Sequence, residues 1–343
     1  MSRREEVARL AGVSPRTVSN VVSGAVTVAP ATRQRVLDAI ERLDYRPSEI
    51  GRMLRKGRTG MIALVIPDIE SPYFSELGSA LTDAARRRGY TLVIEQTDGV
   101  RDRELELLAR ADTKAVFDGL IVNPLALTDE DLNRPTPRGR PIVLLGEETH
   151  PGFDHVHIDN FAAAQDAVRH LLGLGRTRIL ALGAQRKGHS SSSLRLAGFE
   201  AVIAESDATG SVEYVDSFSR ASGAAAVERV LERGPAPDAI FCFSDVLALG
   251  ALAALADAGV AVPDEVAVAG FDDVEDGRYV RPSLTTVSPA KDVIAEAAID
   301  ALHRRIEGDD SEPAHVLAPY RLVTRASTIS GDRVGAPLRR TDR

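Results

Sequence analysis

The 343-residue chain has a net charge of −8, and its 44% hydrophobic and 27% charged residues exclude a disordered chain. Its apolar runs are shorter than the ~20 residues of a membrane helix, and its length predicts two or three domains. The start, MSRREEVARL, lacks the apolar core of a signal peptide, and the single cysteine, Cys242, excludes an internal disulfide, so we expect a cytoplasmic protein without a membrane partner.

Basic residues are concentrated at the start of the chain. Residues 1–60 contain 12 Lys and Arg against 6 Asp and Glu, a net charge of +6, whereas residues 61–343 have a net charge of −14. A basic segment attracts polyanions, and an acidic remainder discourages non-specific adhesion to them. The charge pattern therefore predicts a small polyanion-binding head on a larger acidic body.

Residues 1–46 have the spacing of three short helices. The first ends at Gly12, the second is capped by Ser14 with Pro15 at its first position, and the third stops before Pro47. A tight glycine turn between two short helices, with small polar and basic residues on the second, is typical of a DNA-binding helix-turn-helix. The alternative is the apolar stripe of a small helical bundle.

The segments VARLAGVSPRTVSNVVSG and TRQRVLDAIERLDYRPSEIGRMLRKG resemble the head of the LacI-type (lactose-repressor) family of bacterial transcription regulators. The resemblance implies a homodimer that places one recognition helix per chain in the major groove of a palindromic double-stranded operator. It aligns Pro15 and Arg16 with the family's variable base-reading pair, and Asn20 with a third reading position that is often arginine. Since asparagine pairs with adenine and arginine with guanine, we expect a different base preference there. Phosphate contacts, which set register, are expected from Ser14, Thr17, Ser19 and Thr27.

Residues 47–60, PSEIGRMLRKGRTG, are short, basic and bounded by proline and glycine. Taken alone they are a linker, because a helix of this length is marginal in water and Gly51 weakens it by about 1 kcal/mol relative to alanine. In the family this segment becomes a helix on operator DNA and inserts a leucine into a central minor-groove step, the position of Leu54. Arg52 and Arg55 would contact the backbone of the DNA. The alternative is a flexible tether with an incidental leucine.

Beyond this hinge, short apolar runs alternate with amphipathic segments. Runs such as MIALVIP, DGLIVN, PIVLLG and EVAVAGFD predict at least seven buried parallel strands and a doubly wound α/β fold. The resemblance covers residues 61–330 as an effector-binding and dimerisation domain, similar to sugar-binding periplasmic proteins with two lobes and three chain crossings. The expected boundaries are lobe 1 at about 61–159 and 288–318, lobe 2 at about 160–287 and 319–330, and a flexible tail over 331–343. The tail has no leucine heptad, so a dimer is expected rather than a tetramer.

Ligands of open parallel sheets bind beyond the carboxyl ends of the strands, where this chain has polar and aromatic residues. The resemblance assigns an arginine, an aromatic residue and an aspartate to the effector cleft, at Arg195, Phe218 and Asp272. Two-pronged hydrogen bonds from the arginine and the aspartate, with an aromatic face between them, suit a polyhydroxylated ring, so a sugar or sugar derivative is expected. The other candidates are Tyr73, Phe74, Asn123, Ser191, Ser193, Ser244 and Phe271.

Several residues near these strand ends, Asp245 and Asp273 among them, have a structural alternative to ligand binding. For Asp245 and Asp273 it is a helix cap, for Phe271 a place in the core, and for the run SSSS a mobile loop. Ser244 and Gly146 replace an asparagine and an aspartate of some sugar-responsive family members. The identity of a particular sugar therefore does not transfer to this chain.

No motif in the sequence supports catalysis. His155 and His157 share one strand face without the carboxylate or cysteine pattern of a metal site, and GxSxG, P-loop and GxGxxG motifs are absent, so no cofactor is expected. The leading hypothesis is a transcription regulator of the repressor type, controlled by a small molecule bound between two lobes. The alternatives are a solute-binding protein without a regulatory role and a sugar-processing enzyme.

Overall fold

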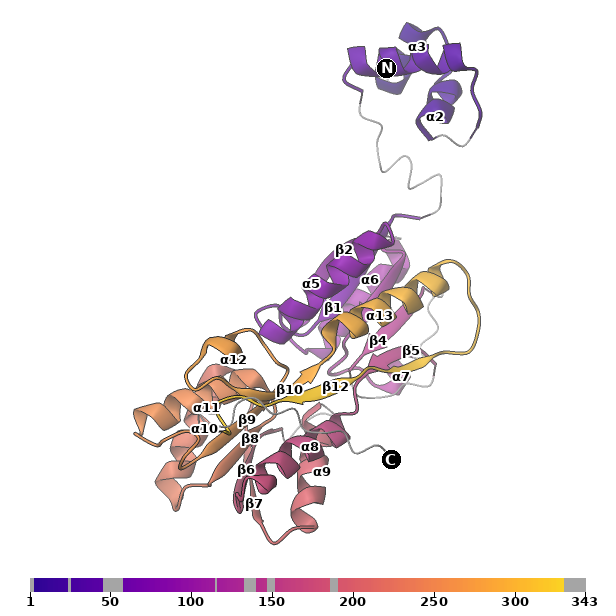
Figure 1. The fold of residues 1–343 in the computed structure, drawn as a ribbon. Coiled ribbons are helices and arrows are strands. Elements are labelled where there is room, and N and C mark those ends of the chain that lie inside the picture. The colour runs from indigo at the N-terminus through magenta and orange to yellow at the C-terminus, as the bar shows by residue number, and fades with distance from the viewer. Residues whose placement is uncertain are drawn as a thin grey trace. The chain divides into compact units, whose positions relative to one another are not determined.

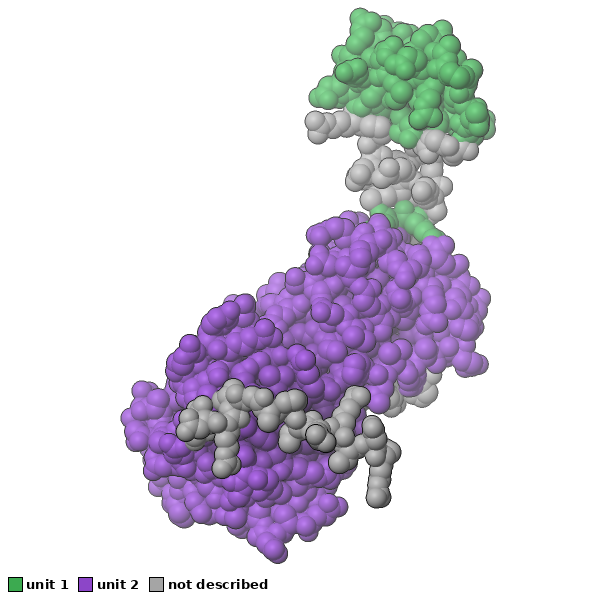
Figure 2. Space-filling view, viewed as in Figure 1, with its two compact units in different colours: residues 1–60 green, residues 61–343 purple. Residues whose placement is uncertain are grey.

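The computed structural model describes residues 3–23, 26–45, 58–114, 116–132, 140–146, 152–185 and 191–329. The chain divides into two compact units, residues 1–60 and 61–343 (Figure 2). Within the described ranges, no helix combines the length and the apolar character needed to cross a membrane.

The first unit contains the predicted helix-turn-helix. Its described helices are α1 (Arg3–Ala11), α2 (Pro15–Ser23) and α3 (Pro30–Arg42). Gly12 turns the chain between α1 and α2 with φ of +64°, a conformation that glycine adopts without steric cost. The hydroxyl oxygen of Ser14 accepts a hydrogen bond from the backbone N–H of Thr17 at 3.1 Å, which caps α2, and Pro15 follows as its first residue.

Apolar side chains of all three helices form a core within the first unit. Val18 and Val21 bring α2 into this core, and each is at most 5% exposed. The opposite side of α2 is left for polar residues, as the helical period requires. The buried members of the core are Val7, Ala8, Ala11, Val18, Val21, Val36 and Ala39.

The second unit contains two six-stranded sheets (Figure 1). The first has the order β11-β5-β4-β3-β1-β2 and is parallel throughout. The second has the order β12-β10-β9-β8-β6-β7 and is parallel except for the antiparallel pair of β10 with β12.

We call the parts built around these sheets lobe 1 and lobe 2. The strands of lobe 1 are β1 (Met61–Ile66), β2 (Thr91–Gln96), β3 (Gly119–Val122), β4 (Ile142–Leu145), β5 (Asp154–His157) and β11 (His315–Leu317). Those of lobe 2 are β6 (Arg178–Ala184), β7 (Thr209–Tyr214), β8 (Ala239–Cys242), β9 (Ala267–Phe271), β10 (Thr285–Pro289) and β12 (Tyr320–Val323).

Helices cover both faces of the first sheet, as the continuous apolar strands predict. Alternate residues of β1 belong to different cores, with Leu64 packed in the core that includes α5 (Pro72–Arg87) and α13 (Lys291–Ile306). Val65 faces the other core, which contains Leu107 of α6 (Arg101–Lys114). The short helix α7 (Asp129–Leu132) completes the helices described in lobe 1.

Lobe 2 has the same doubly wound construction. Its helices are α8 (Asn160–Gly173), α9 (Ser191–Ala204), α10 (Arg220–Arg233), α11 (Asp245–Asp257) and α12 (Asp276–Tyr279). In β6, Ala181 packs in the core shared with α8, and Leu182 packs in the core shared with α10 and α11. Cys242 of β8 is fully buried, and burial raises the pKa of its thiol, so this cysteine serves as an unreactive strand residue.

The chain passes between the two sheets between β5 and α8, between β10 and α13, and between β11 and β12. Each lobe is therefore assembled from segments that lie far apart in the sequence. Because the connections follow the carboxyl ends of β5 and β10, they run beside the strand ends where a ligand of such sheets binds.

Helices α10 and α11 approach each other closely at two glycines. A Cβ atom at Gly250 of α11 would lie 1.9 Å from the carbonyl oxygen of Arg220. A Cβ atom at Gly223 of α10 would lie 2.2 Å from the carbonyl oxygen of Leu247. Glycine at both positions thus permits the backbones to touch, and this fixes α10 against α11.

Candidate functional site

The candidate DNA-binding residues of the head lie on the side of α2 that its core leaves open. Pro15 and Arg16 are exposed, and Thr17, Ser19 and Asn20 are half-buried. Ser14 is exposed too, but its hydroxyl is already bonded to the backbone of Thr17 and lies 2.9 Å from the Thr17 hydroxyl oxygen. Its position in the structure is therefore that of a helix cap, and a phosphate contact would be an additional role.

The remaining DNA-binding candidates are divided between two segments. Thr27 is exposed, in the connection between α2 and α3. Gly51, Arg52, Leu54 and Arg55 lie outside the described residues, so the hinge stays a prediction.

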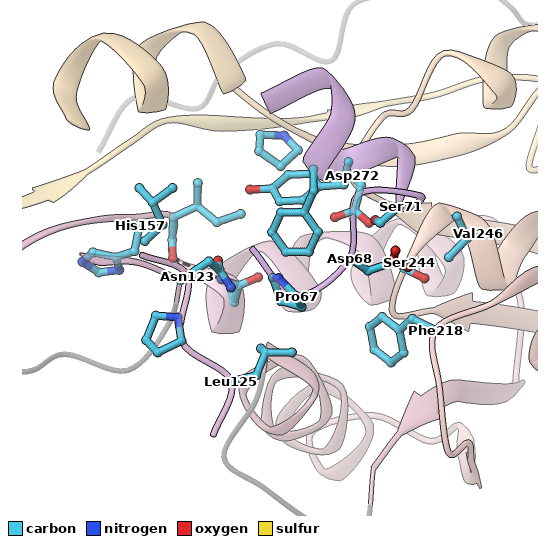
Figure 3. A pocket seen from close by; sticks show the side chains of 18 of the residues that line it. Pro67, Asp68, Ser71, Asn123, Leu125, His157, Phe218, Ser244, Val246 and Asp272 are labelled. Carbon is cyan, nitrogen blue, oxygen red and sulfur yellow. Dashed lines mark hydrogen bonds between the residues drawn. The ribbon is translucent and has the colours of Figure 1, made fainter. Parts of the chain in front are cut away.

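A pocket of about 460 Å³ lies between lobe 1 and lobe 2 (Figure 3). Its walls come mostly from residues at or just after the carboxyl ends of the parallel strands, which is where open α/β sheets bind ligands. Lobe 1 contributes Asp68 after β1 and Asn123 after β3, and lobe 2 contributes Ser244 after β8 and Asp272 after β9. In Figure 3, Asp68, Ser71, Ser244 and Asp272 lie toward one end of the pocket, and Asn123 and His157 lie toward the other.

Most of the predicted effector residues line this pocket. They are Tyr73, Phe74, Asn123, Arg195, Phe218, Ser244 and Asp272. They come from segments of both lobes separated by up to about 200 residues in the sequence, and the fold brings them together.

Three predicted effector residues are not among the lining residues. Phe271 is fully buried at the end of β9, which is the core placement that was its alternative. Ser193 is exposed on α9, because the inward side of that helix is taken by Ser192 and Arg195, which lie three positions apart. Ser191 begins α9, and its side chain lies outside the described part of the chain.

Arg195 is held in a fixed orientation at the pocket wall. The residue is only 7% exposed to solvent. Its Nε donates a hydrogen bond to Oδ1 of Asn160 at 3.0 Å, and its Nη1 donates to the carbonyl oxygen of Phe243. The guanidinium carbon lies 3.6 Å from the centre of the Phe271 ring, a cation–π contact. The Phe271 ring thus packs against the guanidinium group of Arg195. It fixes the position of that pocket residue without lining the pocket itself.

Asp272 carries two signs of a functional residue. Its φ is +116°, a conformation that is strained for a residue with a Cβ atom and that is typical of binding sites. Burial raises the pKa of its carboxyl group to about 6, although the positive charges of Arg195 and Lys291 act in the opposite direction. Its backbone N–H donates to the carbonyl oxygen of Val287 at 2.8 Å, which fixes the residue at the end of β9.

Ser244, rather than Asp245, caps helix α11. The Ser244 hydroxyl accepts a hydrogen bond from the N–H of Leu247 at 3.4 Å. The fully buried carboxyl group of Asp245, whose pKa burial raises, accepts instead from the hydroxyl of Thr286 at 2.6 Å and from the N–H of Val274 at 2.9 Å. Asp245 therefore holds the chain that follows Asp272.

Asp273 also lacks the predicted alternative role of a helix cap. It accepts hydrogen bonds from the hydroxyl of Ser288 at 2.8 Å and from Nη2 of Arg325 at 2.5 Å. These contacts connect the loop after β9 to β10 and to the segment that follows β12.

Several lining residues were missed in the sequence. Asp68, Asn160 and Gln185 follow strand ends, so the rule that found Asn123 also covers them. His157 ends β5, and its ring stacks on that of His155 with the centres 4.7 Å apart. Desolvation lowers the pKa of His157, so a neutral imidazole lines the pocket at neutral pH. In the described ranges, no group of three or more His, Cys, Asp and Glu side chains is arranged to hold a metal ion.

Two family models match the chain. The model for bacterial regulatory proteins of the lacI family matches residues 5–48, and the model for a periplasmic binding protein-like domain matches residues 168–328. Catabolite control protein A of Priestia megaterium is 32% identical over 326 residues, which cover 94% of this chain and 98% of that protein.

Solved structures of regulators match both units. The lac repressor dimer bound to operator and to the anti-inducer ONPF matches with a TM-score of 0.83 and 26% identity, covering 94% of this chain and 98% of that chain. The complex of the transcriptional regulator CelR with cellobiose matches with a TM-score of 0.70 and 29% identity, covering 94% and 99%.

Proposed function

Because the chain belongs to the LacI family of DNA-binding transcription regulators, which are not enzymes, we propose that it is a repressor that acts at a palindromic operator. A sugar or sugar derivative bound in the pocket controls its affinity for that operator. The protein acts as a homodimer in the cytoplasm, where operator DNA is found. The match of residues 5–48 to the regulatory family argues against a solute-binding protein without a regulatory role.

The observation that carries the sugar assignment is that Arg195 and Asp272 line the same pocket, together with aromatic side chains. Tyr73, Phe74 and Phe218 line the same pocket. Arginine and carboxylate groups bind vicinal hydroxyls in pairs, and aromatic rings pack on the apolar face of a pyranose. The solved CelR complex holds cellobiose, which supports a sugar ligand for this fold.

The proposed division of labour follows the expected domains. Residues 1–46 bind the operator with the exposed side of α2, residues 47–60 form the hinge, and residues 61–330 bind the effector and the second chain. Effector binding changes the angle between the lobes and therefore the spacing of the two heads. Such coupling requires that the effector bind the two arrangements with different affinity.

The test is a gel-shift titration of the full chain on an operator selected from random duplex DNA. Operator affinity should fall steeply with salt, because phosphate contacts release counterions. A panel of neutral mono- and disaccharides should contain one that changes operator affinity at least tenfold. If no sugar does so while a purine base does, the sugar assignment is wrong and the regulator assignment stands.

The base preference at one operator position should follow the residue at position 20. Asn20→Arg is expected to change the preferred base from adenine to guanine, with a discrimination of about 1–3 kcal/mol. The measurement is selection from a randomised duplex library with the parent chain and the variant. An unchanged preference, with binding retained, would show that Asn20 does not read a base.

A substitution in the hinge should weaken binding to the operator more than binding to random DNA. Leu54→Ala, in the segment outside the described residues, is expected to lose at least tenfold in operator affinity because the wedge that bends the site is removed. Affinity for random duplex DNA should change less than twofold, since phosphate contacts supply it. Equal losses on both DNAs would contradict the wedge assignment.

A further inference from the structure

One side chain of lobe 1 reaches the loop of lobe 2 that carries Asp272. Glu76 lies on α5, and its Oε1 accepts a hydrogen bond from the backbone N–H of Glu275 at 2.8 Å. Its Oε2 accepts from Nζ of Lys291, the first residue of α13, at 2.5 Å. The same ammonium group donates to the carbonyl oxygen of Asp273 at 3.1 Å. Glu76 and Lys291 therefore hold two backbone groups of the loop at residues 273 and 275.

The loop needs to be held because its conformation is strained. Asp272 has φ of +116° and Asp273 has φ of +48°, and residues with a Cβ atom keep such values only where their surroundings impose them. Contacts within lobe 2 fix the first three amides, through Val287 for residue 272, Thr286 for residue 273 and Asp245 for residue 274. The amide of Glu275 is bonded to the other lobe.

We propose that Glu76 and Lys291 are positioning residues for effector recognition, which tie the loop bearing Asp272 to helix α5 of lobe 1. The proposal rests on the assignment of Asp272 to the effector site. Tyr73 and Phe74, at the start of the same helix, line the pocket. A shift of α5 thus moves two pocket walls and the support of the loop together.

The contacts of Glu76 and Lys291 with the loop differ from the contacts of the loop within lobe 2 in how they respond to a movement of the lobes. The contacts of Asp245 and Thr286 lie within lobe 2, so a change in the angle between the lobes leaves them intact. The contacts of Glu76 join the two lobes, so the same change must alter them. A contact that differs between two arrangements is what allows a ligand at one site to act on the other.

The chain contains a matched control on the same two helices. Arg87 of α5 pairs with Glu296 of α13, and both side chains are about half exposed. Both belong to lobe 1, and neither is bonded to the loop at 272–275 in the described contacts. The side chain of Lys291, in contrast, is only 13% exposed. Loss of the Arg87–Glu296 pair therefore removes a contact between α5 and α13 but leaves the contacts of Glu76 and Lys291 with the loop in place.

The experiment compares hydrogen exchange in full-length Glu76→Gln, Lys291→Met and Glu296→Gln with the parent chain. Peptides that contain residues 273–275 should exchange at least tenfold faster in the first two variants and at the parent rate in the third. The double variant should show no further increase, because the two residues act on the loop as a unit. Lys291→Arg, which keeps the charge and the donors, should restore the parent rate.

Exchange at the parent rate in folded Glu76→Gln would overturn the proposal, as would equal acceleration in Glu296→Gln. If Lys291→Met does not fold, Glu76→Gln alone decides. Exchange requires no effector, so this test is separate from that of the sugar assignment. For any sugar of the panel that changes operator affinity, Glu76→Gln should need at least a tenfold higher concentration and Glu296→Gln the parent concentration.

Discussion

Replacing Asp272 with asparagine is expected to abolish the response of operator binding to effector while raising the free energy of unfolding at neutral pH. Effector affinity should fall about 100-fold, because the substitution removes the charged group that we propose as acceptor of the ligand hydroxyls. The gain in stability arises because the folded protein keeps a buried carboxylate ionised at pH 7. With the pKa raised to about 6 from 3.8, this ionisation costs up to about 3 kcal/mol.

The sign of the pH dependence follows from the raised pKa. The folded chain binds the Asp272 proton more tightly than the unfolded chain, so the free energy of unfolding falls as the pH rises from about 4 to about 6. The Asp272→Asn variant lacks this contribution, so its advantage should be present at pH 7 and absent at pH 4. Effector binding by the parent chain should weaken below about pH 6, where Asp272 becomes protonated.

Urea unfolding at pH 4 and at pH 7 measures this difference for the parent and the Asp272→Asn variant. Asp68→Asn is the control, since Asp68 lines the same pocket but is only half-buried. A variant that is destabilised equally at both pH values would show that Asp272 is structural. If the operator affinity of the Asp272→Asn variant still changes on addition of effector, Asp272 is not part of the effector site.

Replacing Gly250 with alanine is expected to destabilise the second unit by more than about 3 kcal/mol, at the upper end of overpacking effects. The new methyl group would lie 1.9 Å from the carbonyl oxygen of Arg220 and 2.8 Å from the amide nitrogen of Ala224. Both are backbone atoms of α10, so no side chain can rotate away and the helices must separate.

This separation should also affect the pocket. Helix α10 begins two residues after Phe218 and α11 begins directly after Ser244, and both of these residues line the pocket. The measurement is thermal unfolding of the full chain, with Gly173→Ala as the control. Gly173 is at the end of α8, and nothing lies within 4 Å of its added Cβ atom, so that variant should gain up to about 1 kcal/mol. Similar melting temperatures for Gly250→Ala and the parent would mean that α10 and α11 are free to move apart.

The features of this molecule that could be predicted from the sequence are those determined by residues close together in the chain. Gly12, Ser14 and Pro15 each act on their own turn of chain, so the helix-turn-helix could be located from the order of its residues. The rule about strand ends led to Asn123 and Asp272 for a similar reason, because each follows directly on an apolar run.

Contacts between distant segments could not be predicted in this way. The stacking of Arg195 on Phe271 and the ion pair of Lys291 with Glu76 join residues whose spacing in the sequence carries no signal. The conformation of Asp272 is equally hidden, because aspartate rarely adopts its φ and only the surrounding contacts impose it. From the sequence, His157 is considered only as a metal ligand and rejected in that role, whereas its place at the end of β5 makes it part of the pocket.

The three passages of the chain between the sheets have a consequence for synthesis on the ribosome. The buried core of the head lies within residues 7–39, and the apolar side chains that pack against it extend to Tyr45, so the head can fold once this short segment has emerged. Neither sheet can be completed so early, because β11 and β12 are made only near residues 315–323. The nascent chain thus acquires its means of contacting DNA long before it acquires a pocket. A product truncated before residue 285 would keep the head and lack strands from both sheets.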